Sequence, residues 1–243
     1  KHSNWGLSIG PLSSKGGSLE MDGTSKLYLT SNTGTGLSNR GSSHISKGAI
    51  ISITGNGNCG IKNYNELKID EGVNVTISQN STSSNGGGIY NNGAMVLPTD
   101  ANLYNNHAKS AGDDIYNYNY SNSDAIYIQF NDVKVEDGFA LDGVNGTVEH
   151  CTDTIDGWYD DSRVVKDKPE TGRWEAHAGD TNHIVQYTDF TDDRVTLVGT
   201  KALKAAHGLT DLTIQKVDEK GELIKTDETT FILKNTEGNY YQK

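Results

Sequence analysis

Asparagine recurs in this sequence in two interleaved series at nearly even spacing. The first series closes the stretches GLSN, GIKN, GIYN and DIYN, with steps of 24, 28 and 26 residues, and consists of Asn39, Asn63, Asn91 and Asn117. The second closes LTSN, ITGN, ISQN, LYNN and IQFN, with steps of 24, 24, 26 and 25 residues, and consists of Asn32, Asn56, Asn80, Asn106 and Asn131. Two series that advance in step predict one structural coil per repeat.

Short runs with a period of two, such as LKID (67–70) and VNVTIS (73–78), lie between these asparagines and are typical of strands with one buried face. We therefore predict an all-β protein built on a parallel β-helix of about five coils. The crossover preference of parallel strands favours a right-handed coil. An asparagine tolerates the left-handed backbone of a sharp corner, and its amide can bond to the equivalent amide in the next coil. The two series should thus form asparagine ladders.

The repeat covers residues 17–145, and the composition changes on both sides of it. We predict an N-terminal cap over residues 1–16 and a β-rich cap or linking domain over residues 146–208, because the edge strands of an open coil invite pairing with other chains. Residues 209–243 alternate and turn in a way that predicts the strands of an incomplete β-sandwich module.

The composition argues against two classes of partner. The formal net charge is −11, with no cluster of Lys and Arg, so the chain should repel nucleic acid and anionic lipid. The sequence contains no run of about 18 apolar residues, so it predicts no membrane span. The chain carries 28 Gly, 3 Pro and 12 Tyr, which suits strands and turns.

The C-terminal stretch TIQKVDEKGELIKTDETTFILKNTEGNYY, within residues 212–241, resembles the opening strands of the B-type collagen-adhesin module. This prealbumin-like module occurs in surface proteins and pilins of Gram-positive bacteria. Such modules often carry an internal isopeptide bond, and the resemblance implies that Lys216 matches its lysine. The acid and amide partners would lie in later strands, so we expect Lys216 to be a solvated surface lysine here.

Other stretches resemble surface proteins as well. IDGWYDDS, RWEAH and LKAAHG are similar to segments that join Asn- and Gly-rich β-helices to such modules in surface proteins of gut Firmicutes. NGGGIYNNG is similar to the coils of bacterial adhesins and polymorphic outer-membrane proteins. The resemblance implies an extracellular protein of the bacterial cell wall, joined to other modules of the same parent protein.

Five tyrosines in the predicted coils are candidates for ligand binding, because tyrosine offers contact area with one polar group. They are Tyr90, Tyr104, Tyr116, Tyr118 and Tyr120. We expect an adhesin or stalk protein that binds a glycan or matrix protein. A polysaccharide-degrading enzyme of the β-helix class and a purely structural spacer are the alternatives, and tyrosines that only fill strand positions are the plainer interpretation of these rings.

No catalytic or metal-binding pattern stands out. The acidic group Asp153, Asp156, Asp160 and Asp161 could hold a structural calcium ion or supply acid–base chemistry, but solvated loop carboxylates are the simpler expectation. Asp113 and Asp114 should cap a turn. His177, His183 and His207 match no metal-ligand spacing, so we expect neither metal nor cofactor. Cys59 should be a small buried residue; whether it bonds to Cys151 is open.

Overall fold

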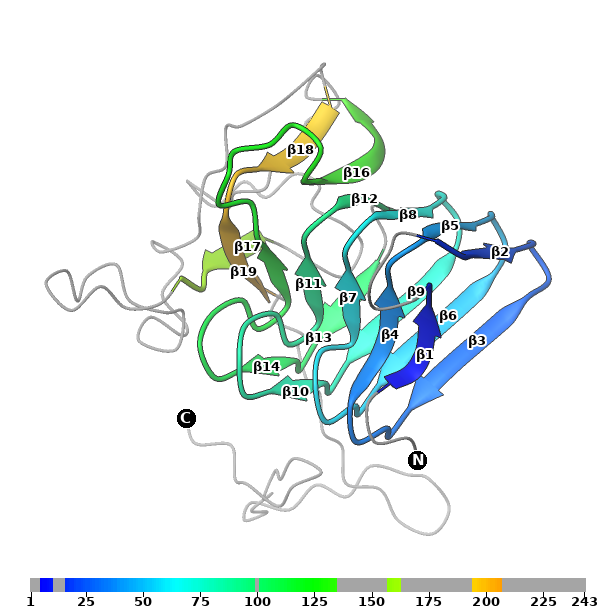
Figure 1. Cartoon of the computed structure of the whole chain (residues 1–243), viewed down its shortest axis with the longest axis horizontal. Coiled ribbons are helices and arrows are strands. Elements are labelled where there is room, and N and C mark those ends of the chain that lie inside the picture. Colours follow the sequence, from blue (N-terminus) through cyan, green and yellow to red (C-terminus); the bar gives the residue numbers. More distant parts are fainter. Residues whose placement is uncertain (1–4, 11–15, 99–100, 135–156, 163–193, 207–243) are drawn as a thin grey trace, which may run out of the picture. The chain divides into compact units, whose positions relative to one another are not determined.

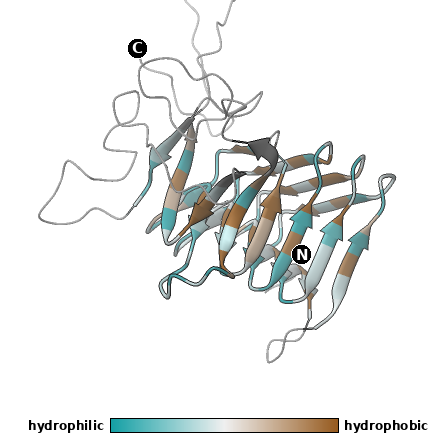
Figure 2. Cartoon of the chain, turned by 90° about the horizontal axis from the view of Figure 1, so that it is seen from above, coloured by the Kyte–Doolittle hydropathy of each residue, from teal (hydrophilic) through white to brown (hydrophobic). Residues whose placement is uncertain are grey.

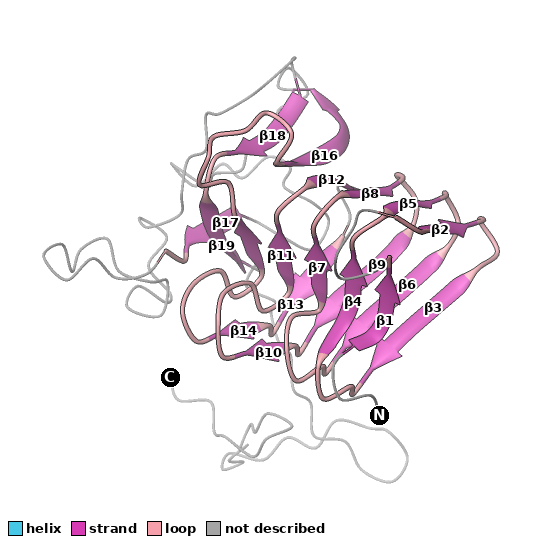
Figure 3. Cartoon of the chain, viewed as in Figure 1, coloured by secondary structure: helices cyan, strands magenta, loops and turns pink. Residues whose placement is uncertain are grey.

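The structure is a computed structural model that describes residues 5–10, 16–98, 101–134, 157–162 and 194–206. These ranges contain strands and turns and no helix (Figure 3). Consequently no apolar helix of membrane-spanning length occurs in the described part of the chain. The chain forms two compact units, Lys1–Gly208 and Leu209–Lys243. The second unit, with Lys216 and the predicted collagen-adhesin-like strands, lies outside the described residues.

Four successive coils make up the body of the first unit (Figure 1). The first coil contains β2 (Ser18–Met21), β3 (Lys26–Thr30) and β4 (Thr35–Asn39), and the second contains β5 (Ser42–Ile45), β6 (Ile50–Thr54) and β7 (Ile61–Asn63). The third contains β8 (Glu66–Ile69), β9 (Asn74–Ser78), β10 (Ser81–Thr82) and β11 (Ile89–Asn91). The fourth contains β12 (Ala94–Leu97), β13 (Asn102–Tyr104), β14 (His107–Ala108) and β15 (Ile115–Asn117).

Equivalent strands of successive coils pair in parallel, so the coils stack into a β-solenoid. The strand order β4-β7-β11-β15 forms one sheet, β2-β5-β8-β12 a second and β3-β6-β9-β13 a third. Register is kept from coil to coil, with Ile61 opposite Leu37 on one side and Ile89 on the other. The predicted all-β parallel solenoid is confirmed. The predicted number of about five coils is too high, because the described residues complete four.

Hydrophobic and hydrophilic residues alternate along many of the strands (Figure 2). Because successive side chains of a strand point to opposite faces, the apolar ones lie buried inside the coils. Most inward columns of the strands repeat an aliphatic side chain, as in Ile53 and Ile77 of β6 and β9, which are opposite one another and fully buried. Their coil-to-coil stacking forms one continuous core, which contains Ile45, Leu67, Met95 and Ile128 on the second sheet. A coil on its own would leave such a row half exposed, so each coil depends on its neighbours.

The second asparagine series forms a buried ladder at the corner that follows β3, β6, β9 and β13. The Nδ2 groups of Asn32, Asn56 and Asn80 donate to Oδ1 of Asn56, Asn80 and Asn106 over 2.9, 2.8 and 3.0 Å. Oδ1 of Asn56 also accepts from the backbone N–H of Asn32, and Nδ2 of Asn56 also donates to the Leu29 carbonyl. Both donor hydrogens and both lone pairs of this carboxamide are therefore used inside the core.

The first asparagine series forms an equivalent ladder at the end of β4, β7, β11 and β15. Asn39, Asn63 and Asn91 donate from Nδ2 to Oδ1 of Asn63, Asn91 and Asn117 over 2.8, 2.8 and 2.7 Å. The same Nδ2 groups of Asn39 and Asn63 bond to the carbonyls of Glu66 and Ala94, at the start of β8 and β12 in the second sheet. All four asparagines are fully buried.

The expectation that the ladder asparagines adopt left-handed backbone is wrong. In the ladder formed by Asn32, Asn56, Asn80 and Asn106, the positive φ falls on the residue before each asparagine. These residues are Ser31 (53°), Gly55 (64°), Gln79 (56°) and Asn105 (53°). The corner thus separates two tasks, since one residue supplies the sharp turn and the next supplies the carboxamide. A left-handed conformation costs a residue with a side chain about 1–2 kcal/mol, which the ladder bonds must offset at Ser31, Gln79 and Asn105.

Asn131 does not belong to the ladder, although its spacing predicted that it would. It lies within β16 (Tyr127–Lys134), which pairs with β12 through Phe130 and Leu97 and so continues the second sheet. The carboxylate of Asp114 takes the position expected for a fifth amide, because its Oδ1 accepts the Nδ2 hydrogen of Asn106 over 2.9 Å. The chain leaves the solenoid pattern after the start of a fifth coil.

The N-terminal end carries a partial coil inside the segment predicted as a cap over residues 1–16. Strand β1 (Trp5–Ile9) pairs in parallel with β4, with Leu7 opposite Leu37 and Ile9 opposite Asn39. Gly6 matches Gly36, and a Cβ on Gly6 would lie 2.5 Å from Nδ2 of Asn32. The close approach of the Asn32 carboxamide explains why this position is glycine.

Antiparallel strands cover two sheets at the other end of the solenoid (Figure 1). Strand β19 (Lys201–Ala206) pairs with β15, β17 (Gly157–Asp160) pairs with β19, and β18 (Arg194–Val198) pairs with β16. All three strands come from the segment predicted as a cap, residues 146–208, whose boundaries stay a prediction. The change from parallel to antiparallel pairing ends the repeat and covers the edges of β15 and β16.

A buried ionic cluster fixes this cap to the last coil. Asp114 and Asp113 are 0 and 1% exposed, and Lys204 Nζ lies 3.3 Å from Asp114 Oδ2 and 4.0 Å from Asp113 Oδ2. Asp114 Oδ2 also accepts the N–H of Ala205, and Asp113 Oδ1 accepts the N–H of Ala108. Asp113 bonds across the corner between β14 and β15 and so caps that turn as expected, whereas Asp114 bonds to Ala205 of β19 and to Asn106 instead.

We predict that Asn80→Ala lowers the free energy of unfolding by about 3 kcal/mol or more, measured by urea denaturation. The change removes the acceptor of Asn56 Nδ2 and the donor to the Ile53 carbonyl, and each buried group left unpaired costs about 1–3 kcal/mol. Asn74→Ala, an exposed asparagine at the start of β9, the strand that precedes Asn80, is the control and should change stability by less than about 0.5 kcal/mol. Equal effects would contradict the ladder's role.

Lys204→Met should destabilise the protein by about 3–5 kcal/mol in the same assay, because it leaves the buried Asp114 carboxylate without its ion-pair partner. Lys26→Met, at an exposed position of β3, removes an equal charge from the surface and should be close to neutral. A Lys204→Met protein as stable as the parent would show that the cluster does not hold the cap.

Candidate functional site

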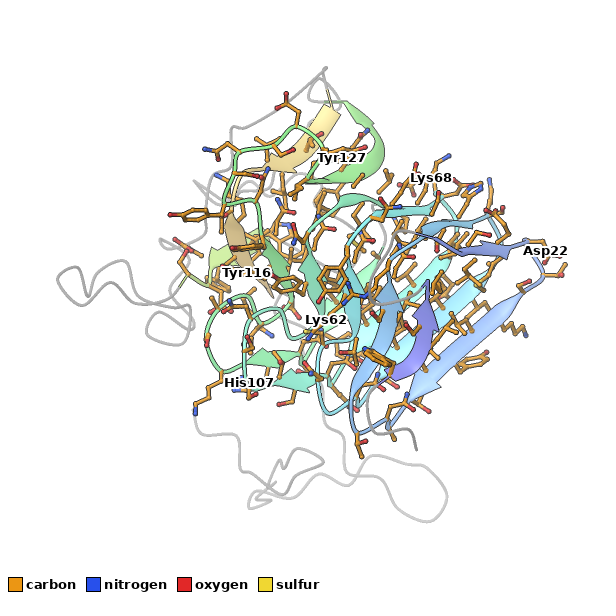
Figure 4. All side chains as sticks on the ribbon, in the orientation of Figure 1. Asp22, Lys62, Lys68, His107, Tyr116 and Tyr127 are labelled. Carbon is orange, nitrogen blue, oxygen red and sulfur yellow. The ribbon has the colours of Figure 1, made fainter. Side chains whose placement is uncertain are left out.

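The outward positions on either side of the ladder formed by Asn39, Asn63, Asn91 and Asn117 carry four tyrosines. An inward asparagine places its two neighbours on the outer face. Lys62, Tyr90 and Tyr116 precede the ladder asparagines and are consecutive partners across β7, β11 and β15. Arg40, Tyr64, Asn92 and Tyr118 follow them. We call these seven residues the aromatic strip; Figure 4 labels Lys62 and Tyr116 on its face.

The tyrosines of the strip contact one another. The ring centroids of Tyr90 and Tyr116 are 5.8 Å apart with 26° between the planes, and Tyr118 lies 6.1 Å from Tyr90 and 6.3 Å from Tyr116 in stacked geometry. Tyr64 is tilted against Tyr90 at 6.2 Å. These distances lie within the range of favourable aromatic pairs. The rings therefore form one connected row along the solenoid axis.

A cation closes the row at its N-terminal end. The guanidinium carbon of Arg40 lies 4.1 Å above the centroid of the Tyr64 ring, which is a cation–π contact. Nε of Arg40 is buried without a hydrogen-bond partner among the described residues. Neither Arg40 nor Lys62 forms an ion pair with any described residue. The strip thus holds two positive charges that no described carboxylate neutralises.

Packing changes the acidity of the central phenols. Partial burial raises the pKa of Tyr90 to about 12, and the neighbouring phenols of Tyr64, Tyr116 and Tyr118 add to the shift because a second phenolate would repel the first. Partial burial, followed by repulsion from Tyr118, also raises the pKa of Tyr116. Both hydroxyls stay protonated at neutral pH and can donate hydrogen bonds.

Three of the five predicted tyrosines come together in the strip, and two do not. Tyr104 ends β13 on the third sheet, opposite Ser78, and Tyr120 is 86% exposed in the segment between β15 and β16. Sequence reasoning missed Arg40, Lys62 and Tyr64. Their signal was present, because each lies directly beside an asparagine of the first series, on the outer face that Tyr90 and Tyr116 share.

The other predicted candidates lie elsewhere or outside the described residues. Cys59 is a buried free thiol whose pKa is raised by burial; Cys151 is not among the described residues. Asp161 is fully buried and accepts from the Asp113 N–H, so the expectation of a solvated loop carboxylate is wrong there. Asp160 accepts from the N–H of Ser162. The undescribed candidates are Asp153, Asp156, His177, His183 and His207.

The described residues hold no group of three or more side chains suited to a metal ion.

The second sheet carries charged side chains that pair with one another. His44 Nε2 and Lys68 Nζ lie 3.0 and 3.1 Å from the Asp70 carboxylate. Partial burial opposes ionisation of Asp70, but the hydrogen bonds from His44 and Lys68 outweigh it and lower the pKa of Asp70. This face contrasts with the strip, whose cations have no such partner.

One surface cleft of about 410 Å³ lies where the last coil meets the cap. Its lining comes from the segment after Tyr118 and from the turn between β18 and β19, and consists of Asn119, Asn122, Ser123, Asp124, Val198, Gly199, Thr200 and Lys201. The carboxamide of Asn119 bonds to the backbone of Ser123 and Ile126 and so holds the loop's own shape. The strip offers more uncommitted groups than this cleft.

No protein-family model, curated protein or solved structure matches the chain. The resemblance of residues 212–241 to a collagen-adhesin module stays a prediction, since these residues lie outside the described ranges.

The raised pKa of Tyr90 predicts a loss of stability at high pH. Between pH 10, near which an exposed phenol ionises, and about 12, the unfolded chain binds fewer protons than the folded one, so the free energy of unfolding falls as pH rises. Tyr90→Phe should reduce this decline between pH 9 and 11.5, measured by urea denaturation at each pH. Tyr28→Phe, at an exposed position, should leave the decline unchanged. Equal slopes for Tyr90→Phe and the parent would refute the shift.

Proposed function

We propose that this protein is an extracellular binding protein, an adhesin or stalk of a bacterial cell wall, whose aromatic strip binds a glycan or a matrix protein. The observation that carries the proposal is the strip itself. Four tyrosine rings and two cations lie in line on one face, and the four tyrosine hydroxyls make no hydrogen bond within the described residues. Groups of this kind are the ones that recur at binding hot spots.

The solenoid holds the strip in a fixed geometry before any ligand arrives. Each strip residue lies next to a buried ladder asparagine, and the backbone N–H groups of Tyr64, Asn92 and Tyr118 donate to Asn39, Asn63 and Asn91 carbonyls over 2.8, 2.7 and 2.7 Å. A surface that is ordered in the free protein loses less entropy on binding. This rigidity supports a binding role.

The glycan-cleaving alternative would need carboxylates open to a substrate. The carboxylates that converge in the described structure, Asp113, Asp114 and Asp161, are buried and accept hydrogen bonds from backbone N–H groups of Ala108, Ala205 and Asp113. Carboxylates bound in this way favour a structural role. The spacer alternative leaves the unpaired cations and hydroxyls of the strip without a purpose, so binding is the preferred proposal.

The location at the cell surface rests on the resemblance of the C-terminal stretch to surface-protein modules and on the build of the molecule. Stacked coils with a continuous core give a stiff rod that can present one face away from an anchoring point. In this proposal the parent protein's other modules provide the anchor, and the solenoid provides the recognition face.

We expect the chain to be retained on at least one member of an immobilised panel of neutral glycans, acidic glycans and extracellular-matrix proteins, without release of reducing ends. Tyr116→Ala should weaken that retention about tenfold or more, as loss of a binding hot spot does. Tyr28→Ala removes an exposed tyrosine from β3, outside the strip, and should bind like the parent. Release of sugar ends would replace the proposal with the enzyme, and no retention would favour the spacer.

A further inference from the structure

The charge of the strip is opposite to that of the whole chain. The formal net charge is −11, yet the outward strand positions of this face carry Arg40 and Lys62 and no acidic residue. On the second sheet, in contrast, lysine and histidine pair with Asp70. An acidic protein repels anions over most of its surface. An anion that is bound here would therefore have to be recognised locally, by these two cations.

The tyrosines of the strip favour an anionic ligand through their donors. Stacking occupies one face of Tyr116 against Tyr90, and Arg40 occupies one face of Tyr64, so these contacts leave less ring face for a ligand. The hydroxyls remain, and their high pKa keeps the central ones protonated. Protonated phenols donate well to carboxylate and sulfate oxygens, because hydrogen bonds to a charged acceptor are the stronger kind.

The dimensions of the strip favour a linear polymer over a folded protein. Its two columns are two strand residues apart, which is about 7 Å, and Arg40 and Tyr118 are three coil steps apart, which is about 14 Å. The footprint is on the order of 200 Å² with side chains included, whereas a stable protein interface covers about 800 Å² per partner. A polymer with charges at regular intervals can run along such a row and meet a cation or a tyrosine in each coil.

We infer that the ligand of the aromatic strip is an anionic glycan, with carboxylate or sulfate groups that bind Arg40, Lys62 and the tyrosine hydroxyls. This inference rests on the proposed binding function and names its ligand class. The glycan lies along the solenoid axis, from Arg40 and Lys62 at one end toward Tyr116 and Tyr118 at the other. The shared chemistry is an oxyanion on a sugar polymer, whether carboxylate or sulfate supplies it.

The test compares pairs of polymers that share a sugar backbone and of which one member is charged and the other neutral. The intact chain is titrated, by isothermal calorimetry, with polygalacturonate and its fully methyl-esterified form, and with dextran sulfate and dextran. We expect binding to at least one anionic member and at least tenfold weaker binding to its neutral counterpart. Raising the salt concentration should weaken the anionic complex, because screening acts on its exposed charges.

Substitutions of Arg40 and Lys62 test whether these two charges bind the anionic polymer. Arg40→Gln and Lys62→Gln should each weaken binding to the anionic polymer about three- to fivefold, as expected for a partly exposed charge pair. The double variant Lys26→Gln/Lys47→Gln changes the net charge by the same amount as Arg40→Gln/Lys62→Gln, away from the strip, and should bind like the parent. Arg40→Lys keeps the charge and shows whether stacking on Tyr64 is needed, and thermal unfolding of each variant verifies its fold.

The outcomes separate this inference from the function on which it rests. Equal, Tyr116-dependent binding of charged and neutral glycans would keep the binding function and overturn the ligand class. Binding of poly-glutamate as tight as that of the anionic glycans would also overturn it, in favour of an acidic polypeptide. Failure of every polymer here, with retention on a neutral glycan or matrix protein in the panel above, would overturn only the anionic class. No retention in either experiment would overturn both.

Discussion

The directional hydrogen bond between stacked asparagine carboxamides sets the geometry of this molecule. Each ladder amide accepts from the coil before it and donates to the coil after it, so coils stack only in register. The ladder also dictates its neighbours: a Cβ on Gly60 would lie 2.8 Å from Asn80 Nδ2 and 2.7 Å from the Gly88 carbonyl oxygen, so this position accepts only glycine without displacement of the ladder. In the last coil no further amide follows, and the residue at the position of Gly60 is Asp114.

A ladder with one direction has two different ends. At the N-terminal side Oδ1 of Asn39 needs donors, and it finds them in the N–H of Gly41 and the hydroxyl of Ser43. At the other side Asn106 and Asn117 still have hydrogens to donate, so the end of the last coil and the cap must supply acceptors. The Asp114 carboxylate and the Gly199 carbonyl do so. An aspartate can only accept, which makes it a chemically suitable end to a row of donors, and Lys204 balances its charge.

The sequence predicted what depends on stacking and missed what depends on distant pairing. Asparagine spacing revealed the solenoid and both ladders because side-chain bonds between coils impose a residue period. The number of coils was overestimated, since Asn131 keeps the period and the strand β18 that pairs with β16 lies more than 60 residues farther along the chain. The outward row was readable in part, because Arg40 and Tyr64 each follow a ladder asparagine. The mutual stacking of the rings was not, because it depends on side-chain torsions that no spacing encodes.

The asparagine ladders and the aromatic strip repeat once per coil in the same register, so both end where the last coil meets the cap. The ring centroids of Tyr90 and Tyr116, which are partners in adjacent strands, lie 5.8 Å apart, and this exceeds the strand spacing of about 4.8 Å, so the two rings are offset as they stack. A fifth coil would place one more outward side chain beyond Tyr116. The cap places Ala202 there instead, as the antiparallel partner of Tyr116 in β19. The antiparallel strand β19 therefore sets the length of the recognition surface, and the turn before it supplies the Gly199 carbonyl that ends one asparagine ladder.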